Sequence, residues 1–129
     1  MVVGIGIDVV EIARIRRLMD RWQDRFLHRV FTEEEVAYAL RRPDPAQHLA
    51  ARFAAKEATL KALGTGLSMG VRWREMEVRR GRGEPPQLAL SGRTAELGEA
   101  RGIRRLHVSL SHDAGLAVAQ VLAEGESAP

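Results

Sequence analysis

The segment from Arg52 to Gly66 constrains the fold most, because it combines a helix that is apolar on nearly every side with a glycine-rich exit. Alanine, leucine and phenylalanine fill most positions from Phe53 to Leu63, which is typical of a helix buried inside a domain. Gly64 and Gly66 then end the helix. A long buried helix needs other elements packed around it, so we expect an α+β domain with this helix at its centre.

Three charged residues, Lys56, Glu57 and Lys61, interrupt this apolar helix. Glu57 and Lys61 are four positions apart and share one face, where an ordinary surface ion pair is one interpretation. The alternative is a binding site, because charges on a buried helix need partners. Lys56 and Lys61 are also the only lysines among 20 basic residues, and the ammonium group of lysine often contacts phosphate.

The composition indicates one compact domain over residues 1–124 and a polar tail over residues 125–129, which we expect to be frayed. The chain has no cysteine, which excludes disulfides and thiolate metal sites. Asp8 and Glu11 interrupt the apolar N-terminal run, so we expect neither a signal peptide nor a membrane span. These features favour a cytoplasmic protein.

Arginines at spacings of three and four form a basic stripe between Glu11 and Val30. The stripe comprises Arg14, Arg17, Arg21 and Arg25, within a chain whose formal net charge is only +3. Two interpretations stay open: a solvated helix face, or a docking surface for an acidic partner, either protein or nucleic acid.

The alternating pattern of Val2–Val10 predicts a strand with Gly4, Gly6 and Asp8 on one face. The two glycines leave room for a ligand or another backbone to come close to the carboxylate of Asp8. Asp8 is either a cap of the following helix or a group bound to a cation, because an unpaired acid in so apolar a strand is costly.

The remaining patterns complete a mostly antiparallel α+β arrangement. Thr32 and Glu35 form a capping box that begins a helix ending near Leu40. The other expected elements are helices over 12–19, 46–63 and 91–100, strands over 73–79, 87–90, 106–111 and 116–122, and a turn over 112–115.

Asp8 and Glu57 are the two carboxylates whose surroundings point most clearly to a metal site. Two carboxylates, completed by water and phosphate oxygens, are a common way to hold Mg²⁺. Lys61 would then neutralise a phosphate, and Arg52 or Lys56 would hold another anionic group. The loop Gly64–Gly66 lets its backbone approach a ligand, so these residues describe a diphosphate site without a P-loop.

Three segments resemble the holo-[acyl-carrier-protein] synthase family of phosphopantetheinyl transferases: GIGIDVVEIARI at 4–15, RFAAKEATLKALGTG at 52–66 and VSLSHD at 108–113. The resemblance covers nearly the whole chain. It implies Mg²⁺-dependent transfer of 4′-phosphopantetheine from coenzyme A to a serine of apo-acyl carrier protein, with release of adenosine 3′,5′-bisphosphate, in fatty acid biosynthesis. It also implies a homotrimer with active sites at the subunit interfaces.

The resemblance further implies a role for each matching residue. Asp8 and Glu57 match the metal ligands, Lys61 matches a lysine near the phosphates, and Glu57 is a candidate base for the serine, directly or through a metal-bound water. The positions that line the nucleotide pocket are Arg52, Gly64, Thr65, Gly66 and His112, and Pro86 and His112 are expected to serve a neighbouring subunit. Arg14, Arg21 and Arg25 match the surface that binds the carrier protein.

Two other classes of function were weighed against this enzyme. An RNA-binding module would use the basic stripe with Trp22 and Trp73, but it leaves Asp8 and Glu57 unexplained, and 5% aromatic residues are too few for a stacking platform. We therefore expect no nucleic-acid partner. A purely structural oligomer would use Glu57 and Lys61 as an interface pair.

Without the resemblance, two interpretations of His112 stay open: it is either a turn residue or a ligand contact.

Overall fold

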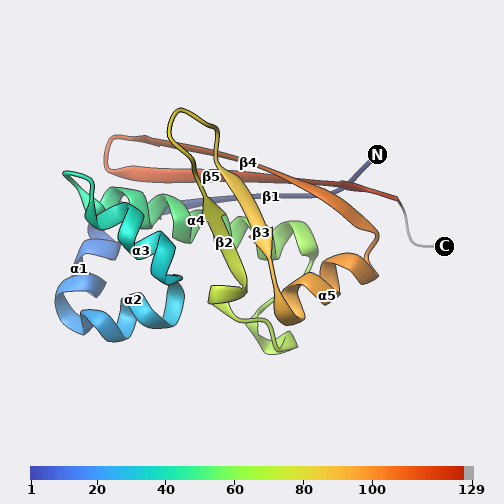
Figure 1. Cartoon of the computed structure of the whole chain (residues 1–129), viewed down its shortest axis with the longest axis horizontal. Helices are drawn as coiled ribbons and strands as arrows, with labels where there is room; N and C mark the ends of the chain where they lie inside the picture. The colour runs from blue at the N-terminus through green and yellow to red at the C-terminus, as the bar shows by residue number, and fades with distance from the viewer. Residues whose placement is uncertain (127–129) are drawn as a thin grey trace.

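The computed structural model describes residues 1–126 as an antiparallel sheet with helices packed on one face (Figure 1). The helices are α1 (Ile12–Trp22), α2 (Asp24–Val30), α3 (Glu33–Leu40), α4 (Pro45–Leu63) and α5 (Gly92–Ala100), with 3-10 turns η1 (Leu67–Met69) and η2 (Trp73–Glu75). The strands are β1 (Val2–Glu11), β2 (Met76–Arg79), β3 (Gln87–Leu90), β4 (Ile103–Asp113) and β5 (Leu116–Gly125).

Long strands from both ends of the chain form the main sheet, in the order β1-β5-β4. Both pairings are antiparallel, and β2 and β3 form a separate antiparallel ribbon. Ala114 and Gly115 join β4 to β5 with left-handed backbone at both positions (φ 50° and 78°), the conformation that a two-residue hairpin turn requires. The first strand therefore depends on the last one for its partner.

Gly4 and Gly6 are needed because the backbone of β1 lies directly against α4. A Cβ atom built on Gly4 would lie 2.1 Å from the carbonyl oxygen of Ala62, and one on Gly6 would lie 1.9 Å from that of Ala58. The space expected beside the glycines is thus filled by the helix. This close contact brings Asp8, two positions beyond Gly6, to the side of α4.

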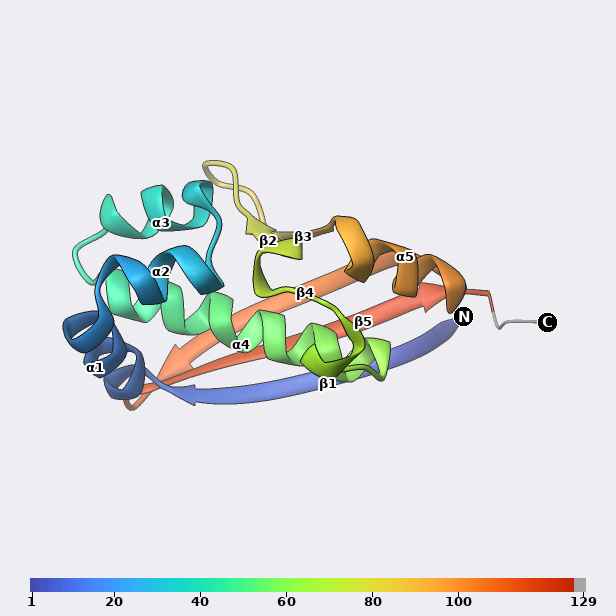
Figure 2. The same cartoon turned by 90° about the horizontal axis from the view of Figure 1, so that it is seen from below.

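Helix α4 runs across the main sheet and forms the centre of the core, as Figure 2 shows. Helices α1, α2 and α3 gather at one end of it, and α5 lies at the other (Figure 2). Fourteen residues of α4 are buried, which explains why its sequence is apolar on nearly every side. The α+β fold with a central buried helix is confirmed.

Several bounds of the expected fold are wrong. Strand β4 covers Ile103–Asp113 rather than 106–111, so the turn expected over 112–115 is limited to Ala114 and Gly115. Trp73–Glu75 forms the turn η2, so the strand begins only at Met76. Strand β5 continues to Gly125, and the amide of Glu126 donates to the carbonyl of Gly102 at 3.0 Å, so the expected fraying does not apply to these two residues. Residues 127–129 of that tail lie outside the described part of the chain. Within residues 1–126, no helix is both long enough and apolar enough to cross a membrane.

Candidate active site

Asp8 and Lys61 meet where β1 crosses α4. The ammonium of Lys61 donates to Oδ1 of Asp8 at 3.2 Å and to the carbonyl of Ile7 at 2.9 Å. The side chain of Asp8 is 19% exposed and that of Lys61 is 54% exposed, so both remain accessible to a ligand. Residues 53 positions apart in sequence are thereby brought into contact.

Glu57 belongs to the same group. Burial raises the pKa of Glu57, and the nearby charge of Asp8 raises it further, while Lys61 and Arg14 act in the opposite direction. Two carboxylates that repel one another beside a partly exposed surface are suited to binding a cation. We call Asp8, Glu57 and Lys61 the acidic cluster.

The loop Gly64–Gly66 forms the exit of α4, three positions beyond Lys61. Gly64 adopts the left-handed conformation (φ 67°) that ends the helix, and the amide of Thr65 donates to the carbonyl of Leu60 at 3.0 Å. Apart from the glycines themselves and their neighbours in the chain, no atom of residues 1–126 lies within 4 Å of a Cβ built on Gly64 or Gly66, so open space adjoins both. The hydroxyl of Thr65 is buried and has no hydrogen-bond partner among residues 1–126. This loop thus combines a hydroxyl that has no partner among the described residues with open space beside its two glycines.

Lys56 does not lie in the candidate site, which corrects the sequence prediction. Its side chain has no exposed surface, and its ammonium contacts Oε1 of Glu35 at 2.7 Å, the carbonyl of Trp73 at 3.0 Å and the carbonyl of Met76. Burial lowers the pKa of Lys56, and Glu35 opposes that effect. All three donors of the ammonium are occupied, so none is free for a ligand phosphate.

Arg52 lies on a different side of α4 from the acidic cluster. Its guanidinium faces a cavity of about 480 Å³ that we call the arginine pocket, lined by Glu34, Ala37, Tyr38, Arg41, Arg52, Val78, Arg79, Arg80 and Gly81. The guanidinium stacks 4.1 Å from the ring centroid of Tyr38. Its Nε and Nη2 atoms are buried without a partner among residues 1–126. Burial lowers the pKa of Arg52, and the nearby Tyr38 and Glu35 oppose that effect.

Pro86 and His112 lie apart from both groups. Pro86 directly precedes β3 and does not line the arginine pocket. His112 lies near the end of β4, where its Nε2 atom is 3.0 Å from Nε2 of Gln47. In a single chain the structure therefore brings Asp8, Glu57 and Lys61 together, but it does not bring Pro86 or His112 to them.

The three arginines expected to bind a partner are all exposed, and they lie on two helices. Arg14 and Arg21 lie on α1, whereas Arg25 lies on α2, after a break at Gln23 with φ 48°. The guanidinium carbon of Arg14 lies 5.9 Å from the ring centroid of Phe53, which is one turn from Glu57. The basic surface therefore begins beside the acidic cluster.

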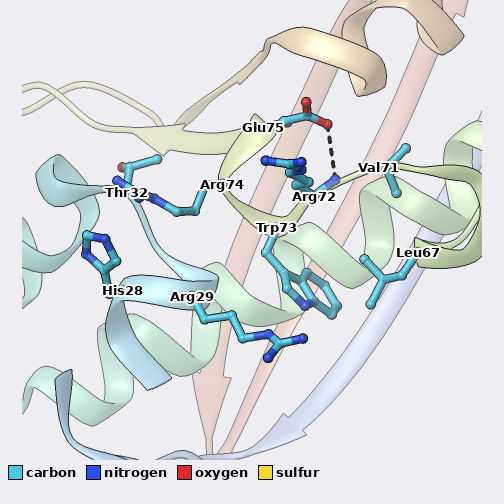
Figure 3. A pocket seen from close by; sticks show the side chains of 9 residues that line it. All are labelled: His28, Arg29, Thr32, Leu67, Val71, Arg72, Trp73, Arg74 and Glu75. Carbon is cyan, nitrogen blue, oxygen red and sulfur yellow. Dashed lines mark hydrogen bonds between the residues drawn. The ribbon is translucent and has the colours of Figure 1, made fainter. Parts of the chain in front are cut away.

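Sequence reasoning missed a cavity of about 730 Å³ between α2 and the segment 67–75, shown in Figure 3. His28, Arg29, Arg72 and Arg74 surround it, and Leu67, Val71 and Trp73 supply apolar lining (Figure 3). Trp73 also packs on Phe53, with ring centroids 5.2 Å apart. The excess of arginine in both segments was the available signal, although no periodicity linked them.

The sequence and fold of this chain match one class of enzyme over nearly their whole length. Residues 4–120 match the sequence profile of the 4′-phosphopantetheinyl transferase superfamily, and the chain belongs to that superfamily. Within it, the chain is similar to proteins named holo-[acyl-carrier-protein] synthase. It is 51% identical over 122 residues to that of Syntrophotalea carbinolica, covering 95% of each chain, and 51% identical over 128 residues to that of Anaeromyxobacter sp. strain K, covering 97% and 98%.

Solved structures of the same kind share the fold. The crystal structure of the Neisseria meningitidis holo-[acyl-carrier-protein] synthase superposes with a TM-score of 0.86 at 35% identity, covering 96% of this chain and 99% of that one. The Helicobacter pylori synthase, solved in complex with coenzyme A, superposes with a TM-score of 0.82 at 32% identity, covering 93% and 99%. The resemblance read from the sequence is thereby confirmed.

Proposed function

We propose that this protein transfers 4′-phosphopantetheine from coenzyme A to a serine of apo-acyl carrier protein, releasing adenosine 3′,5′-bisphosphate, in fatty acid biosynthesis. The acidic cluster is the observation that carries this proposal, because it gathers two carboxylates and an ammonium from distant parts of a superfamily member. The names of the similar synthases, and the coenzyme A bound to the Helicobacter pylori protein, support the choice of donor and acceptor.

The chemistry requires one bond to form and one to break. The serine oxygen bonds to the phosphorus that carries pantetheine, and the bond from that phosphorus to the bridging oxygen breaks. The electron pair of the broken bond leaves with adenosine 3′,5′-bisphosphate. Glu57 is suited to accept the serine proton, because burial and Asp8 raise its pKa above the ordinary value. Lys61 is suited to hold a phosphate oxygen while charge develops.

The residues present fit a bound Mg²⁺, which we include in the proposal. Asp8 and Glu57 would hold the ion, and the mutual repulsion of their carboxylates would be relieved by it. Residues 1–126 contain no group of three or more histidine, cysteine or acidic side chains placed to hold a metal, so the proposal gives the ion two protein ligands only. When bound, Mg²⁺ neutralises phosphate charge during the transfer.

The arginine pocket is proposed to take a phosphate of the nucleotide half of coenzyme A. Arg52 is a buried cation with two unpartnered nitrogen atoms, and such a group is costly unless an anion reaches it. Arg41 and Arg80 add positive charge to the same lining. Gly64, Thr65 and Gly66 are proposed to contact the donor from the end of α4, and Pro86 and His112 from a neighbouring subunit.

An acidic carrier protein would dock on the basic surface formed by α1 and α2. Arg14, Arg21 and Arg25 are exposed there, and Arg14 connects that surface to Phe53 and the acidic cluster. The cavity of Figure 3 continues the same surface with more arginines and an apolar lining. Association driven by these charges should weaken as salt is added.

We further propose a homotrimer, because the outer face of the main sheet is apolar and uncovered. Ile5, Ile7 and Val9 are 58%, 55% and 53% exposed, and β5 places Leu122 opposite Ile5 and Val118 opposite Val9. Such a patch is typical of an interface between copies. A site shared between subunits would also explain why Arg52 and Glu57 point about 140° apart around α4.

A cytoplasmic location stays a prediction.

Mass spectrometry of apo-acyl carrier protein tests the activity directly. Incubation with this protein, coenzyme A and Mg²⁺ should add the mass of phosphopantetheine, and a chelator should prevent the gain. An unmodified carrier protein in the complete mixture would contradict the proposed function.

Sedimentation tests the trimer. The double variant Ile5→Glu/Val9→Glu should sediment as a smaller species than the parent, whereas Leu40→Glu, on the exposed side of α3, should not.

A further inference from the structure

We infer that the buried Lys56–Glu35 ion pair is a positioning pair for the candidate active site: it holds the walls of the arginine pocket in place around Arg52. The inference rests on the proposed function, in which this pocket takes a nucleotide phosphate. It assigns the pair a role in binding coenzyme A without any contact to that ligand.

The pair joins four segments of the chain through buried atoms. The ammonium of Lys56, on α4, reaches Glu35 of α3 and the carbonyls of Trp73 and Met76. Oε2 of Glu35 accepts from the amide of Val78 on β2 at 3.0 Å, and Oε1 accepts from the amide of Thr32 at 3.0 Å. Both side chains have no exposed surface. Helices α3 and α4, turn η2 and strand β2 are therefore tied to one charged centre.

The walls of the arginine pocket stand directly beside these ties. Arg52 precedes Lys56 by one turn of α4, and Tyr38 follows Glu35 by one turn of α3, so each shares a helix face with its member of the pair. Arg79 and Arg80 follow Val78, whose amide is held by Glu35. The three elements that build the pocket thus depend on this pair for their spacing. Within residues 1–126 no other salt bridge links these elements.

Stability alone does not account for a buried ion pair at this position. A buried ion pair often adds little over apolar residues of the same volume, since both charges lose their water. This pair instead satisfies backbone groups at Thr32, Trp73, Met76 and Val78, which apolar side chains could not do. Its advantage therefore lies in fixing where η2 and β2 sit against α4.

The double variant Lys56→Met/Glu35→Gln separates positioning from stability. It removes both buried charges, and glutamine can still complete the capping box with Thr32. Calorimetric titration should show the affinity for adenosine 3′,5′-bisphosphate falling about tenfold, the order expected when supporting contacts of a site are lost. The Michaelis constant for coenzyme A should rise with it, whereas that for carrier protein should stay unchanged, because Arg14, Arg21 and Arg25 lie on other helices.

Two further variants make the test decisive. Leu97→Ala opens a gap in the separate cluster beside α5 and should lower the melting temperature without changing nucleotide affinity. Glu35→Gln alone leaves Lys56 on its two carbonyls, should give a smaller loss of affinity, and serves if the double variant does not fold. If the double variant folds and binds the nucleotide with the affinity of the parent, the inference is overturned while the proposed function stands. If only Glu35→Gln folds, unchanged nucleotide affinity in that variant has the same consequence. Failure of the parent protein to bind the nucleotide would overturn the pocket assignment, and this inference with it.

Discussion

The two lysines of α4 lie in opposite surroundings, although only five positions separate them. Lys56 has no exposed side-chain surface and contacts Glu35, whereas the side chain of Lys61 is 54% exposed and contacts Asp8. The first charge is enclosed by backbone carbonyls, and the second stands beside two carboxylates at the surface. The contrast teaches that the helix face, rather than the residue type, decides whether a charge can meet a ligand.

The largest expected effect is a loss of turnover on substitution of the two carboxylates beside Lys61. Asp8→Asn and Glu57→Gln should each reduce turnover by about 100-fold or more, since each removes one of two proposed ligands of the ion that neutralises phosphate charge. Their melting temperatures should stay close to that of the parent, because neither side chain is enclosed in the core. Steady-state kinetics and thermal unfolding measure the two quantities; near-normal rates in both variants would remove the metal site.

Matched substitutions of the two lysines test the contrast itself. Lys56→Met should lower the free energy of unfolding by about 3–5 kcal/mol, because it leaves a buried carboxylate and two carbonyls without their partner. Lys61→Met should leave stability nearly unchanged and lower turnover instead, since its side chain is half exposed. Urea denaturation of both variants decides the matter. Equal losses of stability would mean that the two lysines do not differ as described.

Charge reversal on α1 and α2 should have a smaller effect, confined to the carrier protein. Arg14→Glu/Arg25→Glu should raise the Michaelis constant for carrier protein by about tenfold, because steering and docking charges are inverted, with little change for coenzyme A. The start of β4 and helix α1 lie at opposite ends of the molecule (Figure 1). Arg104→Glu, at the second position of β4, is therefore the matched control and should change neither constant. Equal changes for both substrates would give the basic surface another role.

Glu75 is partly exposed, unlike Lys56, but it is held by several hydrogen bonds, unlike an ordinary surface residue. Its substitution should give the smallest effect of the four. Burial raises the pKa of Glu75, but hydrogen bonds from the Arg72 amide, from both donors of Thr94 and from the Arg93 amide outweigh it, so the net pKa lies below its ordinary value. Glu75→Gln should lower the free energy of unfolding by about 1 kcal/mol at neutral pH. The loss is small for a group with several hydrogen bonds, because the carboxylate is partly exposed and screened by solvent.

The pH dependence of that difference follows from the direction of the shift. A depressed folded-state pKa gives stability that is present above the ordinary value of 4.5 and is lost as the pH falls through the folded pKa. The stabilities of parent and Glu75→Gln, measured by urea denaturation from pH 7 downward, should therefore converge in acid. A difference that stays constant across this range would contradict the assignment.

Much of the fold was predictable because local patterns specify it. The apolar run of α4, its glycine exit, and the capping box of Thr32 and Glu35 all agree with the structure. Gly4 and Gly6 likewise indicated a close backbone approach beside Asp8, and the structure has α4 there.

The roles of Lys56 and Glu35 could not be predicted, because they depend on a contact between residues 21 positions apart. The capping box explained Glu35 completely at the level of sequence, so no pattern indicated a second partner. The groups that lie opposite this face of α4 are likewise set by tertiary packing: Arg52 borders a cavity, whereas Lys56 is enclosed by Glu35, Trp73 and Met76. The turn at Trp73–Glu75 was missed because its pattern is too short to distinguish from a strand.

Binding of a divalent ion is the most direct test of the central claim, that Asp8 and Glu57 together hold the metal required for transfer. Titration of Mn²⁺, followed by electron paramagnetic resonance in the presence of coenzyme A, should show one tight site per chain in the parent protein. That site should be lost or strongly weakened in Asp8→Asn and in Glu57→Gln, and retained in Lys56→Met/Glu35→Gln when coenzyme A is saturating. Undiminished Mn²⁺ binding in both carboxylate variants would contradict the claim.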